Sequence, residues 1–194
     1  NQKLRWCAVT VAAEMDCKDA ATTMWSLGAA LLAVAADQSW AAQVTNGSLS
    51  TMPLGSFMSP PPWSKQTPKP DITGSLAFVA FGNVNGDSQV EDLVAWWQDK
   101  TSGSANVRVF LRNGNGFAAN SPWSAAFQQA ATAPADALAV ADMDGDGLGD
   151  LIVGRDHTVT VYQSLGGIGM WPGWVFTWTD GPPISAITTG CLSA

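Results

Sequence analysis

The chain has few of the side chains that carry most enzyme chemistry. Its 194 residues include one histidine, one tyrosine and three cysteines. His157 follows Asp156 at a position where two strands are expected to turn, and an exposed turn residue is the simplest interpretation of it. The sequence also lacks a nucleophile elbow, a zinc-type cluster of histidine and cysteine, and a glycine loop that cradles phosphate. We therefore expect a protein that is not an enzyme.

Charge is scarce, and basic charge most of all. Only 13% of the residues are charged, and nine lysines and arginines against sixteen acidic residues leave a net charge of −7. Nucleic-acid binding needs a basic surface, so this balance argues against it. Hydrophobic residues make up 46% of the chain, which is enough for a sizeable core and excludes disorder. Most of the ten tryptophans are expected to pack in that core, and an exposed subset could bind glycans or proteins.

Long apolar segments are also missing. One uncharged stretch, residues 20–36, is rich in alanine, threonine, serine and glycine, which contribute little transfer free energy. It is also at the lower length limit for a bilayer-spanning helix. Packing as a buried strand or helix explains this segment, and we expect no membrane span.

The most informative feature that is present is the acidic stretch 142–150, Asp-Met-Asp-Gly-Asp-Gly-Leu-Gly-Asp. Ca²⁺ takes six to eight oxygen ligands, and side-chain oxygens at alternate positions of a short loop supply them. Glycines allow the tight wrapping that such a loop needs. A solvated acidic turn is the alternative, but it leaves the crowded like charges unexplained. The candidate Ca²⁺ ligands are the carboxylates of Asp142, Asp144, Asp146 and Asp150 and the carbonyl of Leu148.

The residues that follow this loop have the pattern of strands. Residues 151–153 form a short apolar run, and Thr158 to Tyr162 alternate between polar and apolar side chains with β-branched residues. An EF-hand would continue with a helix, so the acidic loop is predicted to join two strands.

The loop and its preceding strand occur twice. Residues 77–81 align with residues 137–141, and Asn83 aligns with Asp142, 59 positions later. Downstream, Phe57 and Trp63 align with Phe117 and Trp123 at an offset of 60, and residues 169–178 carry a weaker copy. A period near 60 residues, with about four short strands and one acidic loop, is typical of propeller blades.

The acidic loop after an apolar strand resembles the FG-GAP or VCBS repeat of integrin-α-like β-propellers, over residues 75 to about 183. The resemblance implies a mainly β fold, an incomplete β-propeller whose loops bind Ca²⁺. In the first loop the family pattern expects the closing carboxylate at Glu91, so either one residue is inserted or the glutamate is the ligand. The two asparagines of this loop predict weaker binding. Its implied ligands are Asn83, Asn85, Asp87, Gln89 and, as the closing carboxylate, Asp92.

Four regions follow from these patterns. Residues 1–30 form an N-terminal segment, and residues 31–74 form a degraded partial blade with a hairpin turn at Asn46-Gly47. Blades with the first and second calcium loops occupy residues 75–133 and 134–194.

In the N-terminal segment, Leu4 to Thr10 and Glu14 to Cys17 resemble the opening strand and helix of a transferrin lobe, which predicts a short α/β segment. The ligands of transferrin iron have no counterpart here.

The expected function follows from the blade count and the calcium loops. Propellers close with about four to eight blades, so two clear blades and a degraded one leave open edges. We expect a calcium-stabilised structural or adhesive subunit that binds other protein chains, with contacts at the first 60 residues and at 171–178. A lectin-like module that binds glycans and the accessory propeller of a larger hydrolase are the alternatives.

The expected location is extracellular or at the cell surface, with a lumenal compartment as the alternative. Calcium loops of modest affinity are typical of compartments where this ion is abundant. The chain begins at Asn1 without a methionine or a signal peptide, as expected of a mature secreted protein or a fragment of a longer one. Cys7, Cys17 and Cys191 allow at most one internal disulfide.

Overall fold

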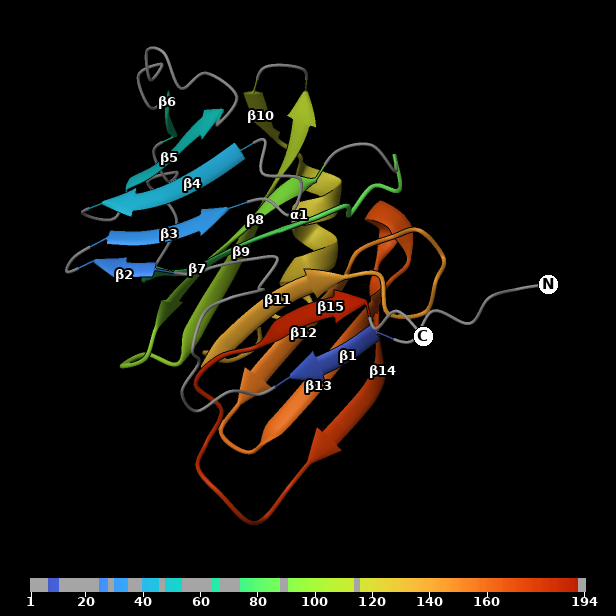
Figure 1. Ribbon diagram of the computed structural model, residues 1–194. Coiled ribbons are helices and arrows are strands. Elements are labelled where there is room, and N and C mark those ends of the chain that lie inside the picture. The colour runs from blue at the N-terminus through green and yellow to red at the C-terminus, as the bar shows by residue number, and fades with distance from the viewer. Residues whose placement is uncertain are drawn as a thin grey trace.

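The computed structural model describes residues 74–87, 91–113 and 116–191 and, nearer the N-terminus, the backbone of six strands. Side chains are described only from residue 74 onward. Most of the regular structure in these residues is antiparallel β-sheet (Figure 1). The prediction of a mainly β fold is confirmed.

Three sheets follow one another along the chain, and in each of them consecutive strands are hydrogen-bonded neighbours. The first sheet contains β2 (Trp25–Leu27), β3 (Ala30–Val34), β4 (Trp40–Thr45), β5 (Ser48–Pro53) and β6 (Ser64–Gln66). The second contains β7 (Ser75–Gly82), β8 (Asp92–Asp99), β9 (Ser104–Asn113) and β10 (Gly116–Ala119). The third contains β11 (Ala137–Ala141), β12 (Asp150–Arg155), β13 (Thr158–Ser164) and β14 (Met170–Thr177). A two-stranded sheet pairs β1 (Cys7–Thr10) with β15 (Thr188–Cys191).

A strand precedes each acidic loop, as predicted. Both predicted loop-entry strands, 77–81 and 137–141, are strands, and each is the first strand of a four-stranded meander. In both meanders the acidic loop joins the first strand to the second. The strands on either side of the hairpin turn predicted at Asn46-Gly47 pair with each other, Thr45 of β4 with Ser48 of β5, while the two turn residues lie outside the described residues.

The N-terminal region can be compared with its prediction only in part. The predicted opening strand is present as β1, whereas the helix expected near residues 14–17 lies outside the described residues. The uncharged stretch 20–36 contains strands β2 and β3. No helix in the described part of the chain has the length and apolar character to span a bilayer.

The main core lies between the second and third sheets. Side chains of β8 and β9, such as Trp96 and Val107, pack there with Leu138, Leu151 and other side chains of β11 and β12. The opposite face of the second sheet carries another apolar cluster, which includes Leu93 and Phe110. Burial on both faces explains why β8 and β12 are nearly continuous apolar runs.

The opposite face of the third sheet carries a third apolar cluster, which includes Ile152, Val159 and Val161. Ile184, from the segment before β15, is buried in this cluster. Trp178 and Ile187 pack against its border. This segment therefore covers part of the outer face of the third sheet.

One helix, α1 (Ser121–Gln128), was not expected from the repeat pattern. Asn120 caps it by accepting a hydrogen bond from the Trp123 N–H at 3.2 Å, and a proline lies in its first turn. The sequence Asn-Ser-Pro is therefore the local signal for the start of this helix.

The helix seals the outer edge of β9, beyond the point where the short β10 ends. Ser124 Oγ accepts a hydrogen bond from the Val109 N–H. Gln128 accepts one from the Val107 N–H and donates one to the Ala105 carbonyl. Backbone groups that β10 leaves unpaired are thus satisfied by the helix side chains.

Candidate metal centre

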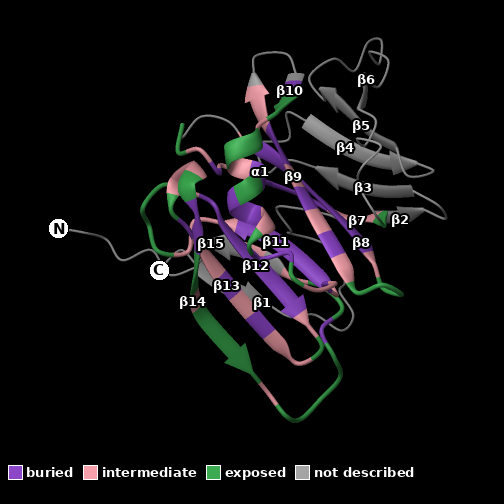
Figure 2. Ribbon diagram, turned by 180° about the vertical axis from the view of Figure 1, so that it is seen from behind, coloured by how far each residue is buried: buried purple, intermediate pink, exposed green. Residues whose placement is uncertain are grey.

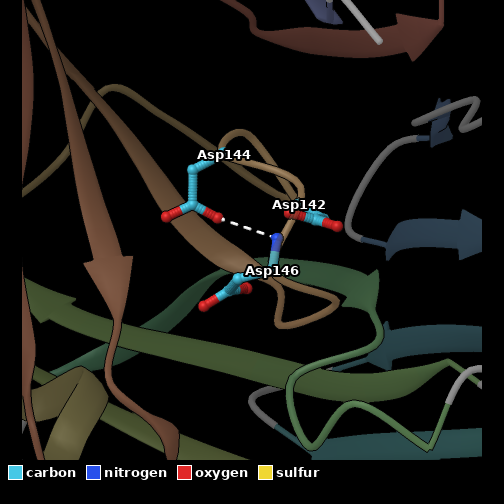
Figure 3. Close-up of side chains that lie close together, drawn as sticks. All are labelled: Asp142, Asp144 and Asp146. Carbon is cyan, nitrogen blue, oxygen red and sulfur yellow. Dashed lines mark hydrogen bonds between the residues drawn. The ribbon is translucent and has the colours of Figure 1, made fainter. Parts of the chain in front are cut away.

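Three carboxylates of the second acidic loop lie together at the end of β11. Asp142, Asp144 and Asp146 each offer an oxygen, and these oxygens all lie within 4.8 Å of one another. Figure 3 shows the three side chains around the turn of the loop. Asp144 and Asp146 are exposed, and Asp142 is half-buried. This cluster could hold a metal ion.

The loop is shaped by hydrogen bonds from its own backbone to these carboxylates. Asp142 accepts from the N–H groups of Gly145 at 2.7 Å and Gly147 at 3.0 Å. Asp144 accepts from the Asp146 N–H, and Asp146 accepts from the Leu148 N–H. Gly145 and Gly147 have φ of 84° and 89°, a region that a residue with a Cβ rarely adopts. The glycines therefore allow the carboxylates to converge.

The three clustered carboxylates place negative charges close together. Burial is the largest effect that raises the pKa of Asp146, and the negative charges of Asp144 and Asp142 raise it further. The hydrogen bond from the Leu148 N–H opposes them. A cation among the three oxygens would reverse this repulsion. All three clustered side chains offer carboxylate oxygens, the ligand type that hard cations prefer over thiolate or imidazole.

Asp150, the predicted closing ligand, is not part of this group of three. Its side chain is fully buried, and its two oxygens accept hydrogen bonds from the N–H groups of Met143 at 2.8 Å and Ser164 at 2.9 Å. Burial raises its pKa to about 6, against the opposing effect of these hydrogen bonds. In this arrangement Asp150 ties the start of the acidic loop to the end of β13.

The first acidic loop repeats these contacts. Asn83 Oδ1 accepts from the Gly86 N–H at 2.9 Å, as Asp142 does from Gly145. Asn85 Oδ1 accepts from the Asp87 N–H at 3.1 Å, as Asp144 does from Asp146. The amide of Asn85 also donates to Asp87. Gln89 lies outside the described residues.

Asp92 occupies the structural position of Asp150. It is fully buried, it accepts from the N–H groups of Val84 and Arg112, and burial raises its pKa to about 6. It also stands at the start of its strand, opposite Gly82, as Asp150 stands opposite Ala141. The equivalent of Asp150 is therefore Asp92 and not Glu91, which means that the first loop carries an inserted residue.

The two acidic loops are in direct contact. The Gly149 N–H donates a hydrogen bond of 2.6 Å to the Asn83 carbonyl. A Cβ at Gly149 would lie 2.9 Å from that carbonyl oxygen and 2.8 Å from Val140 Cγ1. The absence of a side chain at Gly149 is therefore what lets the loops approach this closely.

One residue that sequence reasoning missed reaches the carboxylate cluster. Gln163, on β13, donates a hydrogen bond of 2.7 Å from Nε2 to Asp144 Oδ2. A Cβ at Gly173, on the adjacent strand β14, would lie 2.7 Å from Gln163 Cγ. Gln163 thus connects the acidic loop with β14. Its distance of 19 residues from Asp144 leaves no local signal in the sequence, because the contact depends on the pairing of β12 with β13.

His157 lies in the turn between β12 and β13, where the sequence predicts it. Its Nδ1 lies 2.9 Å from Asp156 Oδ1, and its Nε2 lies 3.1 Å from the Gly181 carbonyl. These two interactions raise the pKa of His157, with that to Asp156 contributing most. Both partners fit a structural role in the turn.

The chain was compared with protein families, curated proteins and solved structures. No protein-family model, curated protein or solved structure shows a significant match to this chain.

Proposed function

We propose that the cluster of Asp142, Asp144 and Asp146 binds Ca²⁺ and that the ion stabilises the fold. The observation that carries this proposal is the convergence of the three carboxylate oxygens within 4.8 Å on a loop that two glycines shape. Ca²⁺ suits a site of carboxylates and backbone carbonyls with flexible geometry, whereas Mg²⁺ demands a stricter octahedron. The carbonyl of Leu148 and, after a rotation away from its backbone partners, the carboxylate of Asp150 would complete the set.

The first loop is proposed as a second, weaker site. Asn83, Asn85 and Asp87 occupy the positions of the three clustered carboxylates, but they carry a single charge among them. Lower ligand charge reduces affinity for Ca²⁺. Contact between the two loops through Gly149 and Asn83 means that an ion in one loop also restrains the other.

We propose further that the sheets are blades of an FG-GAP or VCBS-type β-propeller. Two four-stranded meanders with the acidic loop between their first and second strands support this architecture. The contact of β7 with β11, and of β3 with β7, brings together strands near the start of each sheet, as blade packing around an axis requires. The pairing of β1 with β15 joins the two ends of the sheet array.

The proposed role is that of a structural or adhesive subunit in an extracellular or cell-surface assembly. Such a protein acts through contacts with other chains, and the apolar strand β14 is a surface on which such contacts can form. Catalysis forms no part of the proposed function. The alternative is glycan binding, which the exposure of Trp171 and Trp174 supports, because flat indole rings stack on the apolar faces of sugars.

A calcium titration tests the proposal. Metal-free protein should unfold at a higher temperature when Ca²⁺ is added. At a Ca²⁺ concentration about 100 times the Kd, the ion stabilises the folded chain by about 2.7 kcal/mol. For a chain of this size that corresponds to a rise in Tm of about 5–10 °C. Mg²⁺ at the same concentration should have a smaller effect.

Two variants make this test specific. Asp146→Asn removes one clustered charge and should abolish most of the calcium-dependent rise in Tm. Asp99→Asn is the control, since it removes a half-buried carboxylate at the last residue of β8, outside both acidic loops, and should leave the rise intact. A Tm that does not respond to Ca²⁺ in the parent chain contradicts the proposal.

A further inference from the structure

The outer strand of the third sheet is the most apolar exposed surface in the described part of the chain. β14 exposes 63% of Trp171, 60% of Val175 and 54% of Phe176, and Trp174 is also exposed. Figure 2 shows this strand as an exposed edge beside β13, whose residues alternate between buried and half-buried. Contiguous apolar surface on a folded domain is typical of an interaction site.

The equivalent edge of the second sheet is closed. There β10 has only four residues, and side chains of α1 satisfy the backbone groups of β9 that β10 leaves unpaired. β14 has eight residues, and among the described residues no strand pairs with its outer edge. An open edge strand of this length offers a row of N–H and C=O groups to another strand.

Two aromatic side chains of β14 extend the apolar cluster on the outer face of the third sheet, which includes Val159 and Val161. Trp174 pairs with Val161, and Phe176 pairs with Val159, so each lies on the same face as its buried partner. Val175 pairs with Thr160 and lies on the other face. A strand added beside β14 would therefore find apolar neighbours on both of its faces.

Acidic groups stand at both ends of this apolar strand. At the first end, Gln163 pairs with Trp171 of β14 and holds the carboxylate of Asp144, and the three clustered carboxylates keep a net negative charge even with one divalent ion among them. At the second end, the Trp178 N–H donates to the His157 carbonyl, which places the turn of Asp156 beside it. The side chain of Asp156 is 75% exposed, and Asp180 is exposed as well.

We propose that β14 binds an extended segment of a partner protein by strand addition, and that this segment alternates apolar side chains and carries lysine or arginine at both ends. The proposal rests on the proposed role in protein contacts and specifies the chemistry of the partner. Charge decides against a second copy of this chain as the occupant. Antiparallel pairing of β14 with itself would bring the acidic ends of the two copies together.

Pro172 sets where the added strand can bind. A proline has no N–H to donate, so the continuous backbone ladder runs along residues 173–177. Basic residues about six to eight positions apart in the partner segment then reach the two acidic ends, since a strand rises about 3.3 Å per residue. Attraction between exposed charges of this kind weakens as salt is added.

A fluorescently labelled peptide, Lys-Lys-Thr-Val-Thr-Val-Thr-Val-Lys-Lys, tests the proposal with the full chain by fluorescence anisotropy. The peptide should bind, and its affinity should fall with added salt. The same peptide with glutamate in place of lysine should bind at least tenfold more weakly. A peptide that is N-methylated at alternate residues keeps its side chains and charge but cannot form the ladder, and it should lose binding.

Variants of the chain locate the binding surface. Phe176→Ser and, as a second variant, Trp174→Ser should each weaken peptide binding about tenfold, because aromatic anchors carry most of the binding free energy at such surfaces. Ile168→Ser is the matched control, since Ile168 is 88% exposed but lies before the strand. It should leave the affinity unchanged.

Several results would overturn the inference. One is binding of the acidic or the N-methylated peptide as tightly as the lysine peptide. Another is self-association of the chain that Phe176→Ser abolishes, because it would identify a second copy as the occupant. Calcium separates this inference from the proposed metal site. A calcium-dependent Tm without peptide binding overturns the strand-addition proposal alone, whereas peptide binding without any calcium effect on Tm supports it and contradicts the metal site.

Discussion

Asp150 allows a sharp test of how the buried carboxylates affect stability. Its side chain is fully buried, and burial raises its pKa from 3.8 to about 6 in the folded chain. The folded state therefore holds the proton more tightly than the unfolded state does. It follows that the contribution of Asp150 to the free energy of unfolding of the metal-free protein is fully present below about pH 4 and is lost as the pH rises through 6. Asp92 contributes in the same direction.

The expected size follows from the shift. A pKa difference of about two corresponds to about 2–3 kcal/mol for each buried aspartate between pH 4 and pH 7. Asp150→Asn removes the ionisation and keeps one acceptor oxygen for the N–H groups of Met143 and Ser164. At pH 4.5 the variant should be less stable than the parent by about 1–2 kcal/mol, because one hydrogen bond is lost. At pH 7.5 this deficit should disappear or reverse.

Guanidinium unfolding of metal-stripped protein at pH 4.5, 5.5, 6.5 and 7.5 measures these differences. Asp99→Asn is the matched control. The pKa of Asp99 is lowered by the N–H groups of Thr101 and Ser102, so the stability that Asp99 contributes is fully present above its ordinary pKa of 3.8. Asp99→Asn should therefore keep the pH dependence of the parent between pH 4.5 and 7.5. If Asp150→Asn retains the pH dependence of the parent, or if the parent gains stability between pH 4.5 and 7.5, the reasoning from burial is wrong.

Two further predictions concern the loop contact and the turn of the third sheet. Gly149→Ala should lower the free energy of unfolding by about 1–3 kcal/mol, because the new Cβ meets the Asn83 carbonyl at 2.9 Å. Gly169→Ala, where the Cβ has only ordinary contacts at 3.7 Å and beyond, should change it little, and equal effects in denaturant unfolding would contradict the close approach. NMR titration should show a His157 pKa above 6.5 that falls in Asp156→Asn, and an unchanged value would refute the pairing. The stability that this pair contributes is present below the unfolded pKa and is lost as the pH rises through the folded one.

The strands around the acidic loops were predictable from local patterns. Apolar runs that end in a glycine-containing acidic loop identified both β7 and β11 and showed that the loops join strands. Side-chain alternation with a period of two identified β13. Such features depend on the order of residues within about ten positions, where strand and turn preferences act.

The helix α1 and the insertion in the first loop required the structure. The capping signal of Asn120 lies within the segment that aligns with residues 57–63, for which no helix was predicted, and only the unpaired edge of β9 shows why a helix belongs there. The choice between Glu91 and Asp92 was open in the sequence, because the family pattern favoured one and an insertion favoured the other. Burial and two backbone N–H donors assign the position to Asp92.

The sequence by itself determined the strands on either side of the acidic loops and the three carboxylates that converge in the second loop, because each depends on residues close together in the chain. Only the tertiary structure decided what lies around them. It turned Asp150 inward to tie two strands, brought the Gly149 N–H to the Asn83 carbonyl, and placed Gln163 between Asp144 and the exposed strand β14. These contacts join residues that are 7 to 66 positions apart, and strand pairing and sheet packing, which no local pattern encodes, bring them together.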